Sequence, residues 1–419
     1  MRILHISTSD QGGAAKACLR LHKGFLQQSV NSKVLLKNKT NNEISGTYKI
    51  SHHAIERSFK TKLNTKAVSI LKELNLYKAK PDPFLLERPA GLEMFSYPFS
   101  KYDITKSDLY KQSDIINLHW VANFLDYPSF FKKNKKPIVW TLHDQNPFLG
   151  LEHYSETIVG VDEKGYPIKR ELSKFERSKF KQFEDIKKQA LNTVENLTVV
   201  TPSEWLGNEA KNSPVFENFD SKVIPYGLNS DIFKTLNKTF CREFLNIPED
   251  KTVMLFVADS ISNKRKGYEY LQKALKQIKK NCVLLSVGSK QSQLNQKDNY
   301  LELGRIQDER LMSIIYSAAD VFVIPSLMDN LPNTVLESIM CGTPVIGFPV
   351  GGIPDMIQGG ENGYLTEEIS VPALVKVIEI FLSNPNVFDL KKIRENAVKK
   401  YSLSVQAKAY KALYTKLLH

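Results

Sequence analysis

The chain has 419 residues, of which 42% are hydrophobic and 25% charged, and its 58 basic and 45 acidic side chains leave a net charge of +13. This composition is typical of a soluble globular protein, and the length favours two domains over one. Four scattered cysteines without a CxxC pair argue against a disulfide framework or a zinc cluster, the N-terminus lacks a signal-peptide pattern, and no stretch approaches the ~20 apolar residues needed to span a bilayer.

In the first half of the chain, short apolar runs alternate with helical patterns. Residues 1–7 predict a buried strand that runs into a turn over 8–13, and a helix follows over about 14–28. Such alternation predicts a parallel sheet with crossover helices. The other strands expected in this half are 33–36, 114–118, 138–142 and 197–200.

The alternation restarts after residues 220–233, where a strand meets a turn. We therefore expect the α/β class, with two Rossmann-like doubly wound domains facing each other across a cleft. The predicted domains are 1–220 and 221–400, and an amphipathic helix within 401–419 is expected to cross back onto the first domain. The elements expected in the second half are strands at 253–258, 283–287, 301–304 and 321–324, a helix over 267–280 and a helix from 308.

The most informative segment is 320–355, which reads strand, loop, helix, strand, loop. A helix that begins at the carboxyl end of a parallel strand binds anions, because its free backbone N–H groups and its dipole favour phosphate. Asp329 is expected in the loop at the mouth of that site, and Glu337 one turn inside the helix. A sugar nucleotide requires a phosphate site beside two carboxylates that accept hydrogen bonds from its hydroxyl groups. The alternative is a helix-capping Asp329 and a solvated Glu337.

This segment resembles the donor-site signature of family 4 glycosyltransferases, written E-x7-E, although Asp replaces the first Glu here. The resemblance implies the GT-B architecture, with acceptor binding in the first domain and donor binding in the second. It also implies that Glu337 accepts hydrogen bonds from the ribose hydroxyls. Asp329, with backbone groups of Asn330, Asn333 and Thr334, would hold the transferred sugar and the diphosphate.

Gly12 and Gly13 follow the first strand, where glycines allow backbone N–H groups to approach a ligand, although an ordinary tight turn explains them equally well. The surrounding sequence resembles the colanic-acid and exopolysaccharide branch of the family, whose paired glycines face the cleft. The block IVWTLHDQNPFLGLEHY also resembles that branch. By this resemblance His143 approaches the donor sugar, and a neutral imidazole can hydrogen-bond a sugar hydroxyl. A strand-end histidine satisfied within the core is the alternative.

Several side chains near His143 are candidates for the acceptor side of the cleft. Asp144 would orient His143 or meet the acceptor, and Trp120 would stack on a sugar ring or serve as a core aromatic. The acceptor-side candidates are Asp144, His119, Trp120, His153 and Tyr154.

The turn SNKRKG at 262–267 places Arg265 and Lys266 where the family carries cations that neutralise the leaving diphosphate, although a solvated basic turn is the alternative. The segment that contains Arg305 and Ile306 resembles the family's loop near the nucleobase. No D-x-D sequence occurs in the chain, so we expect no metal in the site and leaving-group stabilisation by cationic side chains and a helix dipole.

The predicted function is a retaining, metal-independent transfer of a sugar from a nucleotide-diphosphate sugar, the co-substrate, to a glycan or lipid-linked glycan in surface polysaccharide synthesis. No cofactor is expected. His143, Asp329, Arg265 and Lys266 are the predicted catalytic residues. A sugar-nucleotide epimerase and a non-catalytic nucleotide-sugar-binding protein remain as alternatives. Nucleic acid is excluded as a partner for lack of any matching motif.

Residues 54–80 carry seven basic and two acidic side chains, with apolar residues mostly four apart. This pattern predicts an amphipathic helix that either lies on an anionic membrane or packs on the core of the protein. A second basic cluster spans 169–189. We therefore expect a cytoplasmic protein, with peripheral contact at the inner face of the plasma membrane as one interpretation of the helix.

Overall fold

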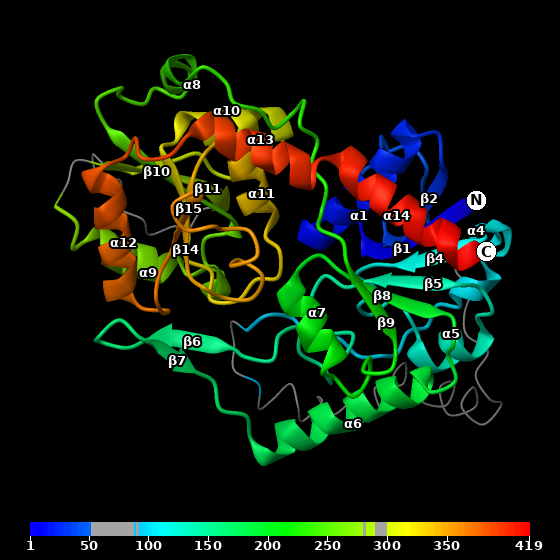
Figure 1. Cartoon of the computed structure of the whole chain (residues 1–419). Coiled ribbons are helices and arrows are strands. Elements are labelled where there is room, and N and C mark those ends of the chain that lie inside the picture. Colours follow the sequence, from blue (N-terminus) through cyan, green and yellow to red (C-terminus); the bar gives the residue numbers. More distant parts are fainter. Residues whose placement is uncertain (52–87, 89–91, 280–281, 290–299) are drawn as a thin grey trace, which may run out of the picture.

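The computed structural model describes residues 1–51, 88, 92–279, 282–289 and 300–419. Two parallel sheets, each covered by helices, form the two halves of the molecule (Figure 1). The predicted α/β class with two doubly wound domains is therefore confirmed. The helix predicted within 54–80 lies outside the described residues.

The first sheet contains seven strands among the described residues, in the order β3-β2-β1-β4-β5-β8-β9, and all of its strand pairs are parallel. Its central strands are buried almost throughout, as expected for a sheet covered on both faces. The strands are β1 (Arg2–Ser9), β2 (Asn31–Asn38), β3 (Thr47–Lys49), β4 (Ile115–Leu118), β5 (Ile138–Thr141), β8 (Leu197–Thr201) and β9 (Asp220–Val223).

The second sheet has the order β12-β11-β10-β13-β14-β15, again with parallel pairs. Counted within this half, the order is 3-2-1-4-5-6, which is the dinucleotide-binding order with its crevice between the first and fourth strands. That crevice lies between β10 and β13. The strands are β10 (Thr252–Ser260), β11 (Cys282–Ser289), β12 (Tyr300–Glu302), β13 (Val321–Ile324), β14 (Val345–Gly347) and β15 (Gly363–Leu365).

Polar caps define most helix starts. For example, the Ser173 hydroxyl accepts from the backbone N–H of Glu176, and the Glu176 carboxylate accepts from the backbone N–H of Ser173. The helices of the first half are α1 (Gly13–Gln27), α4 (Asp108–Gln112), α5 (Tyr127–Lys133), α6 (Lys174–Leu191) and α7 (Glu204–Lys211), with a 3-10 turn η1 (Ile104–Lys106). Those of the second half are η2 (Lys264–Lys266), α8 (Lys238–Phe244), α9 (Tyr268–Leu275), α10 (Glu309–Ala318), α11 (Asn333–Met340), α12 (Val371–Ser383), α13 (Leu390–Tyr401) and α14 (Leu403–Leu418).

One helix is shorter than predicted. The pattern at 267–280 predicts a helix that reaches Lys280, but α9 ends at Leu275. Residues 276–277 form a turn, and Ile278, which follows it, packs against the core of the second half. The composition of this lysine-rich segment favours a helix, but such propensity is weak and does not fix where a helix ends.

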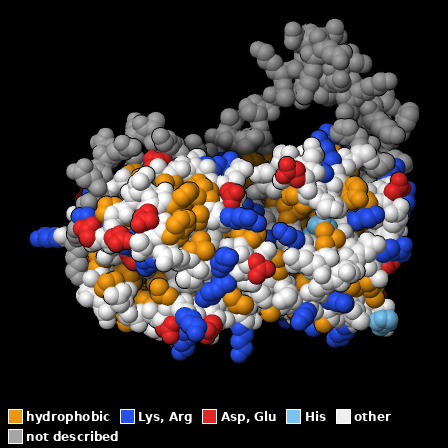
Figure 2. All heavy atoms as spheres, turned by 90° about the horizontal axis from the view of Figure 1, so that it is seen from above, with side chains coloured by type: hydrophobic (Ala, Val, Ile, Leu, Met, Phe, Trp, Pro, Cys, Tyr) orange, Lys and Arg blue, Asp and Glu red, His pale blue; other side chains and the backbone are white. Residues whose placement is uncertain are grey.

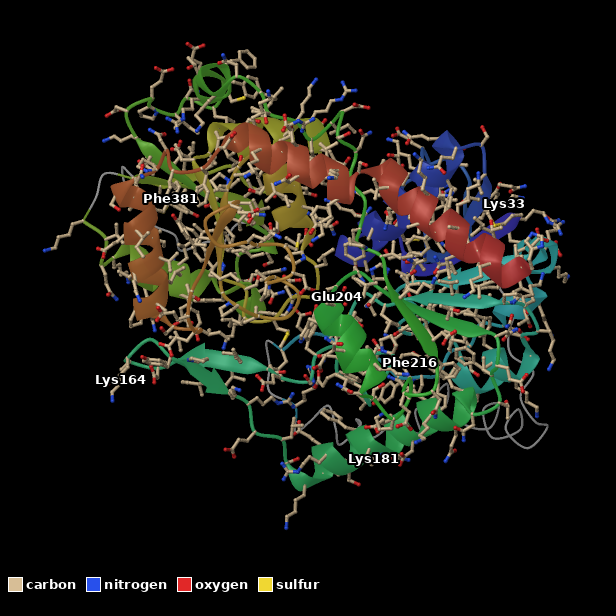
Figure 3. All side chains as sticks on the ribbon, in the orientation of Figure 1. Lys33, Lys164, Lys181, Glu204, Phe216 and Phe381 are labelled. Carbon is tan, nitrogen blue, oxygen red and sulfur yellow. The ribbon has the colours of Figure 1, made fainter. Side chains whose placement is uncertain are left out.

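Two segments cross between the halves. The hairpin of β6 (Ile158–Val161) and β7 (Pro167–Lys169) belongs to the first half in sequence but packs on the second, where the Val371 N–H donates to the Gly165 carbonyl. Figure 3 shows Lys164 in the turn of this hairpin, beside the start of α12. In the other direction, α14 packs on α1 through Tyr410 and Tyr414.

The β9 strand continues the first sheet to Val223, three residues beyond the predicted boundary at 220.

Seen from above, the surface over α13 and α14 carries many basic side chains and few acidic ones (Figure 2). These two helices carry seven exposed lysines, namely Lys391, Lys392, Lys399, Lys400, Lys408, Lys411 and Lys416. Among the described residues, no helix has the length and hydropathy that crossing a bilayer requires.

Candidate functional site

The acid predicted at the mouth of the donor site lies between two cations. Asp329 follows β13, is 8% exposed, and its Oδ2 lies 2.5 Å from Lys266 Nζ and 3.5 Å from an Arg265 guanidinium nitrogen. Burial alone would raise the pKa of Asp329, but the charges of Lys266 and Arg265 outweigh it and hold the pKa below its ordinary value. The structure therefore brings three of the predicted catalytic residues together.

The basic turn is held in place by a glycine. Gly267 has φ +68°, and a Cβ there would lie 1.7 Å from the carbonyl oxygen of Pro325. The Leu327 N–H donates to the Arg265 carbonyl at 2.8 Å, so the turn is joined to the loop that carries Asp329. Only a residue without a side chain allows this approach.

Glu337 lies deeper than predicted. It is 5% exposed on α11, one carboxylate oxygen accepts from the Arg20 guanidinium at 2.9 Å, and the other accepts from the Tyr316 hydroxyl at 3.2 Å. Arg20 comes from α1 and also pairs with Glu309 at 2.7 Å. The alternative of a solvated Glu337 is wrong, because this carboxylate is part of a buried ion cluster between the halves. Acceptance of ribose hydroxyls by Glu337 stays a prediction.

The asparagines at the start of α11 bridge to the first half. The Asn330 amide donates to the His143 carbonyl at 3.2 Å, and its oxygen accepts from the Ser203 hydroxyl at 2.5 Å. Asn333 donates to the Gly13 carbonyl at 3.3 Å, and Thr334 follows it in the first turn of the helix. Gly12, with φ +94°, precedes α1 on the facing side.

Three of the predicted acceptor-side residues, Asp144, Trp120 and His153, form one hydrogen-bonded cluster. The Asp144 carboxylate accepts from Trp120 Nε1 at 2.8 Å and lies 2.6 Å from His153 Nδ1. Burial alone would raise the pKa of Asp144, but His153, Trp120 and the Asn146 N–H lower it. The Trp120 and His153 rings lie 5.6 Å apart. Trp120 thus donates a hydrogen bond inside the protein and is half-buried, and stacking on a sugar ring stays a prediction.

His143 is placed differently from the expectation. Its Nδ1 lies 2.7 Å from the Tyr226 hydroxyl and its Nε2 lies 3.1 Å from Nδ1 of His119. Both ring nitrogens are therefore engaged within the protein, which corresponds to the alternative of a strand-end histidine satisfied in the core. The backbone carbonyl of His143, rather than its ring, contacts the donor-site loop through Asn330.

The two candidates for nucleobase contact lie after β12. Arg305 is exposed, and Ile306 packs against the core of the second half. Gly304, immediately before them, accepts from the Gly288 N–H at 2.9 Å, which fixes the course of the loop beside β11. Contact with a base stays a prediction for both residues.

A cavity of about 140 Å³ opens between the halves beside the cations. It brings predicted acceptor-side residues next to the basic turn, and Arg265 lies over the Tyr154 ring at 5.1 Å. Glu93, which the sequence did not indicate, accepts from Arg265 Nε at 2.6 Å. The lining includes Glu93, His153 and Tyr154 from the first half and Asn263, Arg265 and Met328 from the second.

Three residues that connect the site were not predicted from the sequence, namely Arg20, Glu93 and Tyr226. Arg20 lies seven residues after Gly13, which puts both on one face of α1, and this spacing was the available signal. Glu93 and Tyr226 stand in segments without periodicity, so no local pattern marks them.

The basic cluster at 169–189 does not lie wholly on the surface. Its Lys187 is buried and donates to the Leu149 carbonyl at 2.6 Å.

We expect the stability of the fold to decrease on mild acidification, because burial lowers the pKa of His143 to about 4. The unfolded chain binds a proton at this imidazole below about pH 6.5, whereas the folded chain does not until much lower pH. Stability is therefore complete above pH ~6.5 and falls toward pH ~4, by about 2 kcal/mol between pH ~7 and pH ~5 for this group. Urea unfolding at the two pH values measures it. His143→Gln should reduce the difference, and equal stability of the native chain at both values would contradict the prediction.

Comparison with known proteins adds to this geometry. Residues 237–400 match the family model described as glycosyl transferases group 1. A relative from Bacillus subtilis (strain 168), whose name proposes a teichuronic acid biosynthesis glycosyltransferase (TuaC), is 28% identical over 229 residues, which cover 54% of each chain. The chain thus spans about half the length of this relative.

Solved structures with the same fold match over the whole length. A sucrose-phosphate synthase from Thermosynechococcus elongatus has a TM-score of 0.69 at 19% identity, with 100% of this chain and 99% of that chain covered. Anabaena HepE, solved in complex with UDP and glucose, has a TM-score of 0.67 at 16% identity, with 99% of each chain covered. At these identities the likeness concerns the fold alone.

Proposed function

Because residues 237–400 belong to the glycosyl transferases group 1 family, we propose that the whole chain is a glycosyltransferase that moves a sugar from a nucleotide-diphosphate sugar to a glycan or lipid-linked glycan acceptor. The observation that carries the proposal is the meeting of Arg265, Lys266 and Asp329 at the mouth of the crevice between β10 and β13. This is where open parallel sheets bind nucleotides. The matched family segment contains all three residues.

In the proposed reaction the diphosphate leaves toward the cations. Arg265 and Lys266 would neutralise its developing charge, and the start of α11 would add its dipole. Because this stabilisation requires no ion, the proposal includes metal independence, which the missing D-x-D sequence also favours. When donor binds, Asp329 exchanges part of its contact with Lys266 for a hydroxyl of the sugar.

The proposed acceptor site is the cavity beside Tyr154 and His153. The basic turn toward which the diphosphate would leave also lines this cavity, so the proposal includes attack of the acceptor from that side and transfer with retention of configuration. The name of the Bacillus relative supports a role in surface polysaccharide synthesis. If the acceptor is lipid-linked, the predicted basic helix at 54–80 would contact the inner face of the membrane that carries it. Peripheral membrane contact therefore remains part of the proposal.

A thermal-shift panel with UDP, GDP, ADP and dTDP, each with and without EDTA, tests the donor site. A nucleotide at about 100 times its dissociation constant stabilises the folded chain by about 2.7 kcal/mol. We expect one nucleotide to raise the melting temperature equally in both conditions. A shift that EDTA abolishes would contradict metal independence, and no shift with any nucleotide would contradict the donor site.

The matching sugar nucleotide then separates transfer from the alternatives. A transferase releases nucleotide faster when an acceptor glycan is added, whereas an epimerase changes the donor without acceptor, and a binding protein releases none. The anomeric coupling in the NMR spectrum of the product, compared with that of the donor, tests retention.

A further inference from the structure

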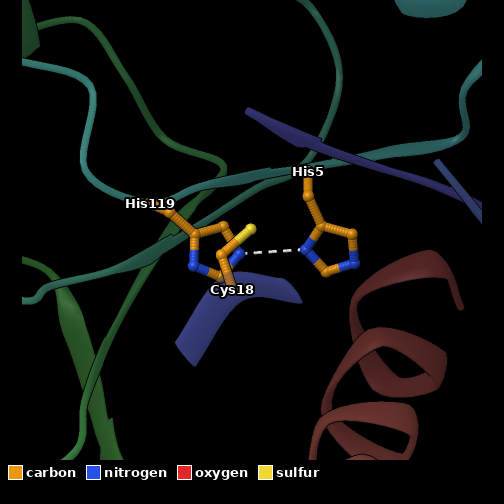
Figure 4. A group of neighbouring side chains, drawn as sticks. All are labelled: His5, Cys18 and His119. Carbon is orange, nitrogen blue, oxygen red and sulfur yellow. Dashed lines mark hydrogen bonds between the residues drawn. The ribbon is translucent and has the colours of Figure 1, made fainter. Parts of the chain in front are cut away.

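Three buried imidazoles of the first half form a row that ends at the Tyr226 hydroxyl, beside the donor-site loop that contacts His143 through Asn330. Nδ1 of His5, on β1, lies 2.9 Å from Nε2 of His119, which follows β4. Nδ1 of His119 lies 3.1 Å from Nε2 of His143, and Nδ1 of His143 lies 2.7 Å from the Tyr226 hydroxyl. Figure 4 shows the first of these contacts. Each ring therefore meets the next through opposite nitrogens.

Such a row has only two consistent arrangements of hydrogen atoms. A neutral imidazole carries one N–H donor and one acceptor nitrogen. Burial lowers the pKa of all three histidines, so each ring is neutral near pH ~7. If one ring donates through Nδ1, the next must accept at Nε2 and donate through its own Nδ1, and the opposite arrangement reverses every bond.

The inner end of the row decides between the two arrangements. Nε2 of His5 is buried and has no hydrogen-bond partner among the described residues. An unpaired buried N–H is rarer and more costly in proteins than an acceptor that is left unpaired. We therefore expect His5 to carry its hydrogen on Nδ1, and His119 and His143 to follow.

This arrangement makes the Tyr226 oxygen an acceptor from His143, which leaves the hydroxyl hydrogen of Tyr226 to point away from the row. The structure gives this hydroxyl no second hydrogen bond to a described residue. Tyr226 stands where the chain leaves β9 for the second half. Its partner His143 contacts the donor-site loop, because the His143 carbonyl accepts from the Asn330 amide at 3.2 Å. Burial raises the pKa of Tyr226, so the hydroxyl stays protonated.

We propose that the Tyr226 hydroxyl donates a hydrogen bond to an oxygen of the nucleotide sugar bound in the cleft, and that His5, His119 and His143 are positioning residues that orient this hydroxyl. The identity of the ligand rests on the proposed function. The hydrogen positions within the row do not, because they follow from the contacts of the unliganded chain.

A metal ion is the competing explanation for part of the row. Donor atoms of His5, Cys18 and His119 lie within 4.8 Å of one another (Figure 4). Two imidazole nitrogens on a tetrahedral zinc ion are about 3.3 Å apart, given Zn–N bonds of about 2.0–2.1 Å. The 2.9 Å separation between His5 and His119 fits a direct hydrogen bond better. Burial also raises the pKa of Cys18, which favours the thiol over the thiolate that a metal requires.

NMR of the chain labelled with 15N at its histidines tests the row. We expect the signals of His5, His119 and His143, assigned by single His→Gln variants, to show the hydrogen on Nδ1. His22 is an internal control with the opposite form, because its Nε2 lies 2.9 Å from the Ser45 carbonyl oxygen, which can only accept. A hydrogen on Nε2 of His5 or His119, or one zinc ion per purified chain by elemental analysis, would overturn the proposal.

Tyr226→Phe tests the ligand contact, because it keeps the ring and removes the hydroxyl. We expect the nucleotide sugar to bind about 2- to 12-fold more weakly, the usual value of one hydrogen bond. The melting temperature of the free protein should also fall, because the buried Nδ1–H of His143 loses its acceptor. Tyr410→Phe removes a comparable buried hydroxyl, bonded to Thr141, and should leave the affinity unchanged.

The outcomes separate this inference from the proposed function. If the native chain binds the nucleotide sugar and Tyr226→Phe binds it equally well, the ligand contact is wrong and the donor site stands. If the native chain binds no nucleotide sugar, the proposed function fails together with the ligand contact, and the histidine tautomers still decide whether the row orients Tyr226.

Discussion

Gly267→Ala is expected to lower the melting temperature by about 6–12 °C, which corresponds to about 3 kcal/mol of stability for a domain of this size. The left-handed backbone at φ +68° costs an alanine about 1–2 kcal/mol. The new Cβ would also lie 1.7 Å from the Pro325 carbonyl oxygen, which is backbone and cannot turn aside. The turn must therefore move, and Arg265 and Lys266 move with it. Differential scanning calorimetry measures the effect.

The matched control is Gly359→Ala in the same half of the chain. A Cβ at Gly359 meets nothing within 4 Å, and its backbone is not left-handed, so the same substitution should change the melting temperature by about 1 °C or less. Equal melting temperatures for the Gly267 and Gly359 variants would show that the turn accepts a side chain. The Gly267 variant should also bind nucleotide more weakly, because the cations have shifted.

Arg265→Met is expected to reduce turnover of the nucleotide sugar by about 100-fold or more, the usual loss when one preorganised donor to a developing charge is removed. The guanidinium is half-buried, approaches Asp329 at 3.5 Å and donates to the Met328 carbonyl at 2.8 Å, so its position is fixed before substrate binds. Methionine preserves much of the packing volume and removes the charge. The measurement is kcat with saturating donor, by nucleotide release.

Lys264→Met is the control for this variant. Lys264 lies in the same turn and is exposed, and its ammonium group donates to the Val159 carbonyl rather than to Asp329. We expect kcat within about 3-fold of the native value, because an exposed charge contributes little through solvent. A similar loss in both variants would mean that the general positive potential of the turn matters, and would contradict a directed role for Arg265.

Local sequence determined the fold class and the donor half of the site. Strands buried on both faces, such as 321–324, are continuous apolar runs, and the loop and helix that follow them place Asp329 and Glu337 by chain connectivity alone. The order of elements in each half then allows one kind of doubly wound sheet, whose crevice is a property of its topology. For this reason the meeting of Asp329 with the basic turn could be predicted without coordinates.

The tertiary structure alone decided which partners these residues have. Arg20 and Glu337 are 317 residues apart in sequence, and their buried contact exists only because α1 faces α11 across the halves. The histidine row depends likewise on the side-by-side order of β1, β4 and β5, which brings His5, His119 and His143 to successive positions. A sequence pattern records the periodicity of one element at a time, whereas these contacts depend on the distance between elements and on the direction of each side chain.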